Sequence, residues 1–95
     1  MDEINESALD NESIKEVLRK FVKENFLASA GLDTFGDDDS FMEKGIIDST
    51  GILELLEFVE EFFNITVEDE EIIPDNLDSL NKLTSFVKRK AGHAS

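Results

Sequence analysis

The chain has 95 residues, enough for a single domain with one modest core, and 40% of them are hydrophobic, which favours a folded protein. Its 23 acidic and 9 basic side chains give a formal net charge of −14, which argues against nucleic acid and anionic membranes as partners. The chain contains no cysteine, so disulfides and thiolate-bound metals are excluded, and any thiol chemistry must come from a cofactor. We therefore expect a monomer whose partners present basic patches.

Residues 1–12 are polar and acidic, unlike a signal or transit peptide, and no apolar run approaches the length of a transmembrane helix. We expect a flexible acidic lead-in, no membrane insertion and a cytoplasmic protein. Apolar residues at helical spacing predict a first helix that begins at Ser13, where Ser13 and Glu16 form a capping box. This helix is predicted to end near Ala30, with Gly31 as its C-cap. Its basic side chains are interpreted as a solvated face: Lys15, Arg19, Lys20 and Lys23.

A long connection, residues 31–48, follows and is rich in glycine and aspartate. Its apolar side chains predict that it packs against the domain: Leu32, Phe35, Phe41, Met42, Ile46 and Ile47. Asp37, Asp38 and Asp39 suggest calcium, but no register of the loop has the glycine and glutamate spacing of an EF-hand. We interpret them as a solvated acidic loop and assign no metal site, with weak binding of calcium or magnesium as an open alternative.

The second helix is predicted to run to Phe63. One stripe of its apolar residues must face a core: Ile52, Leu55, Leu56, Val59, Phe62 and Phe63. The opposite face consists of Thr50, Glu54, Glu57 and Glu61, with Glu60 and Leu53 near one margin and Phe58 near the other. No lysine or arginine lies between residues 48 and 63, so this face lacks ion pairs along the helix and would suit a basic partner.

The start of this helix combines a capping residue with a serine. Asp48 is a suitable N-cap, because its carboxylate can accept hydrogen bonds from the free amides of the first turn. Ser49 then occupies the first helical position, where its hydroxyl points into solvent beside amides and a helix dipole that favour a phosphate. Ser49 is thus a candidate for phosphate attachment, and an ordinary capping pair is the alternative interpretation.

The remainder of the chain predicts one short and one long helix. Asn64 is a suitable stop for the second helix, and residues 68–73 predict a short third helix halted by Pro74. The last helix is predicted to begin near residues 78–80 and to end at Gly92, and His93 receives no role. The predicted fold class is all-α: a small bundle of three main helices and one short helix, with a long first loop. The domain is expected to span residues 13–91, between a lead-in of residues 1–12 and a tail of residues 92–95.

Residues 45–50, Gly-Ile-Ile-Asp-Ser-Thr, and the acidic helix after them resemble the attachment motif of acyl and peptidyl carrier proteins, usually Asp-Ser-Leu. The resemblance extends over residues 13–90 and implies an acyl-carrier-protein-like fold. It implies that Ser49, with Asp48 beside it, is esterified by phosphopantetheine from coenzyme A, whose thiol carries an acyl or aminoacyl group as a thioester. It also implies that Val67, Ile72 and Ile73 border this arm, although aliphatic residues are equally suited to a core.

By the same resemblance the chain is a carrier and not an enzyme. The implied partners are a phosphopantetheinyl transferase, an adenylate-forming acyl or aminoacyl ligase, and acyl-transfer or condensing enzymes. The implied docking residues are acidic or apolar: Thr50, Leu53, Glu54, Glu57, Glu60 and Glu61. Thr50 stands where the family usually has leucine, which removes one apolar contact. The run ending at Gly51 is more similar to small carriers loaded by adenylate-forming ligases, such as D-alanyl, polyketide and nonribosomal peptide carriers, than to fatty-acid carriers. The cargo stays open among secondary-metabolite, D-alanyl and lipid pathways.

Residues 78–80, Asp-Ser-Leu, spell the usual motif better than the site at Ser49 does. No glycine and apolar lead-in precedes them and little helix follows, so Ser79 is interpreted as a capping residue. The rival function is an acidic helical adaptor or a weak calcium-binding domain without a prosthetic group. An enzyme is disfavoured, and no catalytic residue is assigned, because the chain has no thiol, a single histidine in its tail and no evident base beside Ser49.

Overall fold

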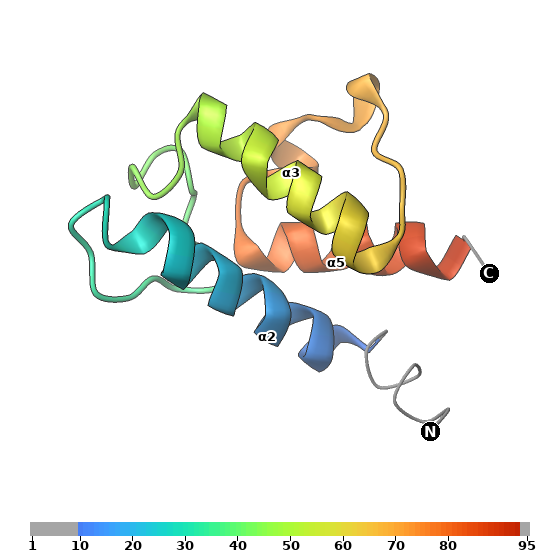
Figure 1. The fold of residues 1–95 in the computed structure, drawn as a ribbon, viewed down its shortest axis with the longest axis horizontal. Coiled ribbons are helices and arrows are strands. Elements are labelled where there is room, and N and C mark those ends of the chain that lie inside the picture. Colours follow the sequence, from blue (N-terminus) through green and yellow to red (C-terminus); the bar gives the residue numbers. More distant parts are fainter. Residues whose placement is uncertain (1–9, 94–95) are drawn as a thin grey trace.

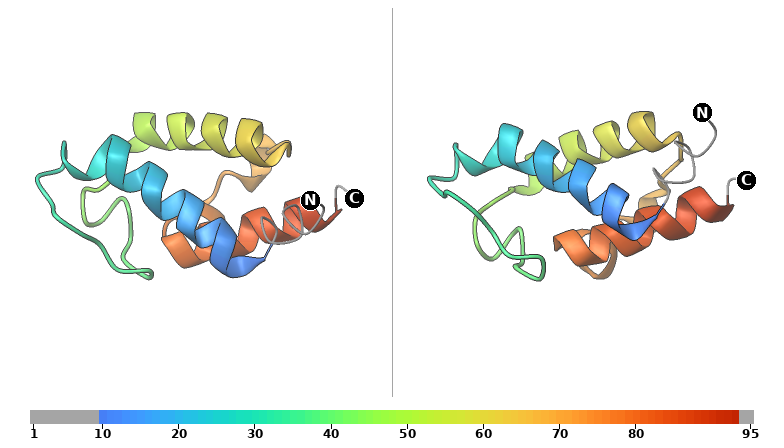
Figure 2. Two further views of the ribbon diagram at one scale, coloured as in Figure 1. Left: turned by 60° about the horizontal axis from the view of Figure 1, so that its bottom comes forward. Right: turned by 90° about the horizontal axis from the view of Figure 1, so that it is seen from below.

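The computed structural model describes residues 10–93, and all the regular structure in that range is helical. The elements in chain order are α2 (Asn11–Val22), the π-helical turn η1 (Lys23–Leu27), α3 (Ser49–Phe63), the 3-10 turn η2 (Asp69–Glu71), α4 (Pro74–Leu77) and α5 (Leu80–His93). The three long helices surround one interior, and the segment that joins α3 to α5 lies on the side of α3 away from α2 (Figure 1). Both views of Figure 2 show the long loop at the end of the bundle where α3 begins. The structure therefore confirms the predicted fold class.

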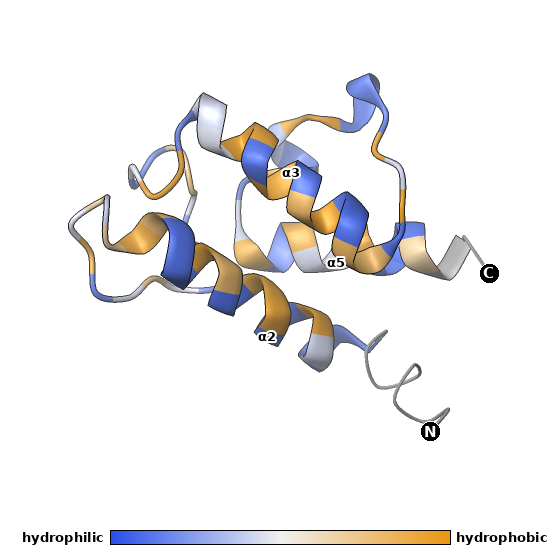
Figure 3. Ribbon diagram, in the orientation of Figure 1, coloured by the Kyte–Doolittle hydropathy of each residue, from blue (hydrophilic) through white to orange (hydrophobic). Residues whose placement is uncertain are grey.

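The core consists of one apolar face from each long helix. Figure 3 shows these faces turned toward the interior and the hydrophilic residues turned away from it. The fully buried helical side chains are Ile14, Leu18 and Val22 of α2, Leu55 and Val59 of α3, and Leu80, Leu83 and Val87 of α5. α5 contacts both α2 and α3, which makes it the central helix of the bundle. Phe41, from the long loop, is also fully buried and closes the core at the loop end.

The beginning of α2 differs from the sequence prediction. The N-cap is Asp10, whose carboxylate accepts a hydrogen bond from the Ser13 amide at 2.9 Å, so the helix begins at Asn11 rather than at Ser13. The expected capping box is wrong because Asp10, three residues before Ser13 and so nearly one helical turn earlier, is the N-cap instead. Residues 10–12 thus belong to the cap and first turn of α2, and residues 1–9 of the expected lead-in lie outside the described residues.

The first helical segment changes its type of helix part of the way along. After Val22 the backbone widens into the π-helical turn η1, and a final turn ends at Gly31. Gly31 adopts a positive φ of 76°, and the amide of Leu32 donates to the carbonyl of Leu27 at 3.1 Å. This is the bonding pattern of a glycine C-cap, so the predicted stop is confirmed.

The segment after α3 contains one more helical turn than predicted. Asn64 ends α3 in the left-handed conformation, with φ 57°, as expected. The predicted short helix at residues 68–73 is the 3-10 turn η2, and the extended conformation of Ile73 agrees with the predicted stop before Pro74. Pro74 also begins a helix that was not predicted, α4. Proline is well suited to the first helical position because the amide it lacks would have no partner there.

The end of the chain also departs from expectation. Ser79 caps α5 as predicted, since its Oγ accepts a hydrogen bond from the Lys82 amide at 3.1 Å. The helix then continues through Gly92 to His93, one residue beyond its predicted end, so residues 92 and 93 belong to α5 rather than to the expected tail. In the part of the chain that the structure describes, no helix is long and apolar enough to span a membrane.

Three side chains expected in the core are instead exposed. Leu32 and Met42 of the long loop retain 37% and 51% of their surface, and Phe62 of α3 retains 55%. Phe62 lies at the edge of the apolar stripe, where its ring contacts those of Phe58 and Phe63. The stripe inferred from spacing is therefore wider than the sector of α3 that the core covers.

Candidate functional site

Ser49 is the first residue of α3, and its side chain is exposed. Asp48 has an extended conformation, and its Oδ1 accepts a hydrogen bond from the Gly51 amide at 2.7 Å. The carbonyl of Asp48 accepts the amide of Ile52 at 3.0 Å, which starts the helical ladder. The predicted capping role of Asp48 is confirmed. Ser49 therefore presents its hydroxyl at the positive end of a helix whose first turn is already formed.

The start of α3 packs closely on the π-helical turn η1. Gly51 is buried, and a Cβ atom at this position would lie 2.8 Å from Ile47 Cγ2 and 2.9 Å from Phe26 Cε1. Only glycine permits this approach without displacing a neighbour. The sequence analysis missed this contact, and its one available signal was a glycine, unfavourable inside a helix, two residues after the serine.

The loop that leads to Ser49 is ordered by its own turn and by the core. Residues 40–45 form a helical turn that ends at Gly45, with φ 71°, and the Phe41 carbonyl accepts the amides of Ile46 and Ile47 at 2.8 and 3.2 Å. Phe41, Ile46 and Ile47 are all buried. The predicted packing of the loop is confirmed for these residues, and Phe35 is buried as well.

The three consecutive aspartates of the loop, Asp37, Asp38 and Asp39, each contact a donor of the protein. Asp37 forms ion pairs with Arg19 and with Lys15, the latter at 3.1 Å, and the hydrogen bond from Arg19, followed by that from Lys15, holds the pKa of Asp37 below its usual value. Asp38 accepts from the Asn81 side chain, and Asp39 accepts from a backbone amide within the loop. Lys15 and Arg19 thus fix the loop to α2. The interpretation of the basic residues of this helix as a solvated face is therefore wrong for these two of the four. Within residues 10–93, no group of three or more potential metal ligands lies close enough together to hold an ion.

An open groove of about 560 Å³ lies beside Ser49, a volume within the range of small-molecule sites, ~300–1,000 Å³. It runs between the start of α3, the turn at Met42 and Glu43, and residues 72–78. Its apolar lining consists of Met42, Ile52, Leu53, Ile72, Ile73 and Leu77. Of the residues expected along the arm, Ile72 and Ile73 line the groove, whereas Val67 does not and packs against the core.

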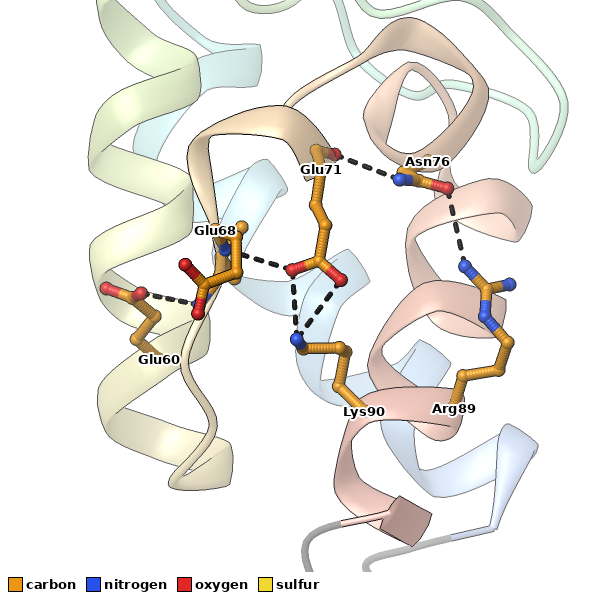
Figure 4. Close-up of polar contacts among 7 residues, drawn as sticks. Glu60, Glu68, Glu71, Asn76, Arg89 and Lys90 are labelled. Carbon is orange, nitrogen blue, oxygen red and sulfur yellow. Dashed lines mark hydrogen bonds and ion pairs between the residues drawn. The ribbon is translucent and has the colours of Figure 1, made fainter.

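The outward face of α3 is acidic, as the sequence predicts. Thr50, Glu54, Glu57 and Glu61 are exposed, and Leu53 retains 58% of its surface. Glu60 differs from the other glutamates, because it is half-buried and its Oε2 accepts a hydrogen bond from the Val67 amide at 2.8 Å (Figure 4). Glu60 therefore holds the chain that leaves α3.

A second set of polar contacts fixes the wall of the groove to α5. Glu71 accepts the Glu68 amide and the Lys90 ammonium, both at 2.9 Å, and these two bonds hold the pKa of Glu71 below its usual value. Asn76 donates to the Glu71 carbonyl at 2.9 Å and lies beside Arg89 (Figure 4). The sequence analysis missed this network because it joins residues that are distant along the chain.

The two Asp-Ser pairs that directly precede a long helix, Asp48-Ser49 and Asp78-Ser79, have different surroundings. Ser79 is only 3% exposed, and its Oγ accepts an amide of α5. The carboxylate of Asp78 accepts the hydroxyl of Ser40 and the amide of Met42. Ser49, in contrast, is open to solvent and to the groove. Only the first pair offers a hydroxyl that another protein can reach.

Comparison with known proteins gives one informative relative. No model of a known protein family matches the sequence. The chain is 32% identical over 74 residues to a D-alanyl carrier protein of Streptococcus suis (strain 05ZYH33). The alignment covers 78% of this chain and 90% of that protein, and so spans nearly the full length of the relative.

Proposed function

The chain belongs to the family of stand-alone carrier proteins, and we propose that Ser49 is its attachment site for a phosphopantetheine arm. When bound, the arm supplies a flexible thiol that holds an acyl group as a thioester, a group that this cysteine-free chain cannot supply itself. The observation that supports Ser49 most strongly is its exposed position at the start of α3 beside the groove. The equivalent hydroxyl of the second Asp-Ser pair, Ser79, is buried.

The residues around Ser49 fit such a group. The free amides and the dipole at the start of α3 favour a phosphate ester over an uncharged hydroxyl. Asp48 caps the helix through the Gly51 amide, which keeps the first turn formed whether or not the arm is present. Ile52 and Ile72 offer apolar surface in the groove to the methyl and methylene groups of a pantetheine chain.

We propose D-alanine, or another small aminoacyl group, as the cargo. The name of the Streptococcus suis relative supports this choice, since the alignment covers 90% of that protein. An adenylate-forming ligase would then load the thiol at the expense of ATP. The carrier contributes tethering, which replaces free diffusion of the thioester by a high local concentration at each docked enzyme.

We further propose that partner enzymes dock on the exposed face of α3. Glu54, Glu57 and Glu61 provide negative charge next to the serine, and Leu53 with Thr50 provides the uncharged centre of contact. Such a contact is fast to form, weak and sensitive to salt, which suits a carrier that leaves each enzyme after one step. Glu60 contributes less than the sequence suggests, because its carboxylate already accepts the Val67 amide.

The proposal is tested by loading the protein. The apo-protein is first converted with coenzyme A and a broad-specificity phosphopantetheinyl transferase, and then incubated with ATP, D-alanine and a D-alanine-activating ligase. We expect a mass gain of one alanyl group that hydroxylamine removes, and no gain for Ser49→Ala. Loading by other acyl groups but not by D-alanine would reject the cargo. Arm-bearing protein that accepts no acyl group from any ligase tested would reject the carrier function at this site.

A further inference from the structure

Asp78 joins three segments that are distant in the sequence. It follows α4, its own amide donates to the Pro74 carbonyl at 3.0 Å, and Ser79 after it caps α5. Its side chain reaches across to the long loop, where Oδ2 accepts the hydroxyl of Ser40 and Oδ1 accepts the amide of Met42 at 3.1 Å. The backbone carbonyl of Asp78 accepts a third bond, from the Phe41 amide at 2.9 Å. Three consecutive loop residues are thus bound by one residue at the junction of α4 and α5.

These bonds continue without interruption to the site. Phe41, whose amide is bound by Asp78, accepts the amides of Ile46 and Ile47 on its carbonyl. Ile47 is buried and lies directly under Gly51, in the first turn of α3. The residue after Ile47 is the N-cap of that helix. A displacement of the loop at Asp78 therefore reaches the serine through two short steps of backbone hydrogen bonding.

The same residue also shapes the groove. Asp78 belongs to its lining, and the loop residues that it holds, Met42 and the neighbouring Glu43, form one wall beside Ser49. Glu43 donates its amide to the Ser40 hydroxyl oxygen at 3.1 Å, so that hydroxyl joins the carboxylate of Asp78 to the wall itself. The carboxylate of Asp78 thus holds the loop wall of the groove, and its backbone carbonyl holds Phe41, from which the bonds toward the serine continue.

We propose that Asp78 is a positioning residue for Ser49: it holds residues 40–42 and thereby fixes both the start of α3 and the loop wall of the groove. The part of this inference that concerns modification rests on the proposed function of Ser49. The part that concerns the loop does not. The pair Asp78-Ser79 then has a function of its own, in which Ser79 caps α5 and Asp78 holds the loop that presents Asp48-Ser49.

The chemistry of the contact suggests a matched pair of variants. Asp78→Ala removes both acceptors and leaves the Met42 amide and the Ser40 hydroxyl without their partner. Asp78→Asn keeps an oxygen for the Met42 amide, and its NH2 group can donate to the Ser40 hydroxyl oxygen, so the geometry can survive without the charge. Asp10→Ala is the control for stability, since Asp10 also accepts a backbone amide but lies at the start of α2.

The experiment measures backbone amide exchange at Ile46 and Ile47 in the apo-protein, and kcat/KM for transfer of phosphopantetheine to Ser49, at a temperature where every variant is folded. For Asp78→Ala we expect exchange at both amides to accelerate about tenfold or more, and kcat/KM to fall about tenfold, mainly through KM. Asp78→Asn should stay within about threefold of the unsubstituted protein in both measurements, as should Asp10→Ala.

Two results overturn the inference. One is exchange at Ile46 and Ile47 that does not respond to Asp78→Ala, or that responds equally to Asp10→Ala. The other is faster exchange with an unchanged kcat/KM, which would show that the loop moves without moving the serine. If the unsubstituted protein accepts no arm at all, the proposed function of Ser49 fails. In that case the Ser49 and Gly51 amide resonances decide the positioning: they must shift in Asp78→Ala and not in Asp10→Ala.

Discussion

Reversing the charge of Glu54 and Glu57 to lysine tests whether α3 is the docking face. Both side chains are exposed and form no hydrogen bond or ion pair within residues 10–93, so their replacement breaks no polar contact there. A surface ion pair contributes about 0.2–1 kcal/mol, and reversal replaces each attraction by a repulsion. For two positions we expect a loss of about 1–2 kcal/mol in the encounter with a basic enzyme, which corresponds to a reduction of about 5- to 30-fold in kcat/KM.

The assay is transfer of phosphopantetheine to Ser49 by a transferase with a basic docking surface, at low salt and at high salt. The matched control is Glu12→Lys with Glu16→Lys, which changes the net charge equally at exposed positions in the first half of α2, at the end of that helix away from η1. We expect the control to lose less than about twofold, because its charges lie away from the serine and are screened beyond about 10 Å. The defect of the α3 variant should shrink as salt is added.

Two outcomes would refute this reasoning. An equal loss in both double variants would mean that the overall field of the protein attracts the enzyme, with no special part for α3. Unchanged kcat/KM in the α3 variant, with helicity confirmed by far-UV circular dichroism, would mean that the acidic face does not dock the transferase.

Three further predictions concern the packing and the charges of the fold. Gly51→Ala should lower the free energy of unfolding in urea by about 0.5–2 kcal/mol, because crowding of Ile47 and Phe26 costs more than the gain of about 1 kcal/mol in helix propensity. An equal or higher stability would contradict the close approach of Gly51 to these two side chains. Thr84→Val should raise Tm by about 4–8 °C, because the buried hydroxyl of Thr84 has no hydrogen-bond partner among residues 10–93, and a lower Tm would mean that this hydroxyl is satisfied. Asp37→Asn should lower the free energy of unfolding at pH 7, and the difference between this variant and the unsubstituted protein should disappear as the pH falls below about 4. The reason is that a carboxylate with a lowered pKa stabilises the fold only while it is ionised. A difference in urea midpoint that stays constant from pH 7 to pH 3 would exclude the ion pair of Asp37 as the cause.

The features predicted correctly from the sequence are local ones. Asp48, Asn64, Gly31 and Ser79 were each expected at a helix end and are found there, because a cap involves only residues within one turn of it. The apolar faces of the long helices that turn toward the core were likewise predicted, because the spacing of apolar residues along one helix is also a local property. Where two local signals compete, spacing does not decide, since Asp10 displaced the expected capping box. Pro74 was predicted only as the stop of one helical turn, and it also begins the next.

The features that the sequence did not predict depend on which distant segments meet. The ion pair of Arg19 with Asp37 and the contact of Lys90 with Glu71 each join elements separated by long stretches of chain. The close approach of Phe26 to Gly51 requires the π-helical turn, which no residue of that turn indicates by itself. For the candidate site, the sequence therefore predicts the serine and its cap, whereas the groove and the contacts that hold its walls emerge only from the fold.

The most direct test of the central proposal is to locate the modification. The apo-protein is incubated with coenzyme A and a broad-specificity phosphopantetheinyl transferase, and its intact mass is measured before the chain is cleaved and its peptides are mapped. We predict a gain of one phosphopantetheine on the peptide that contains Ser49, retained in Ser79→Ala and lost in Ser49→Ala. A folded protein that gains no mass would contradict the proposal and leave an acidic helical adaptor as the better account. A gain on the peptide containing Ser79 would contradict the assignment of Ser49 and leave a carrier that is modified at the other serine.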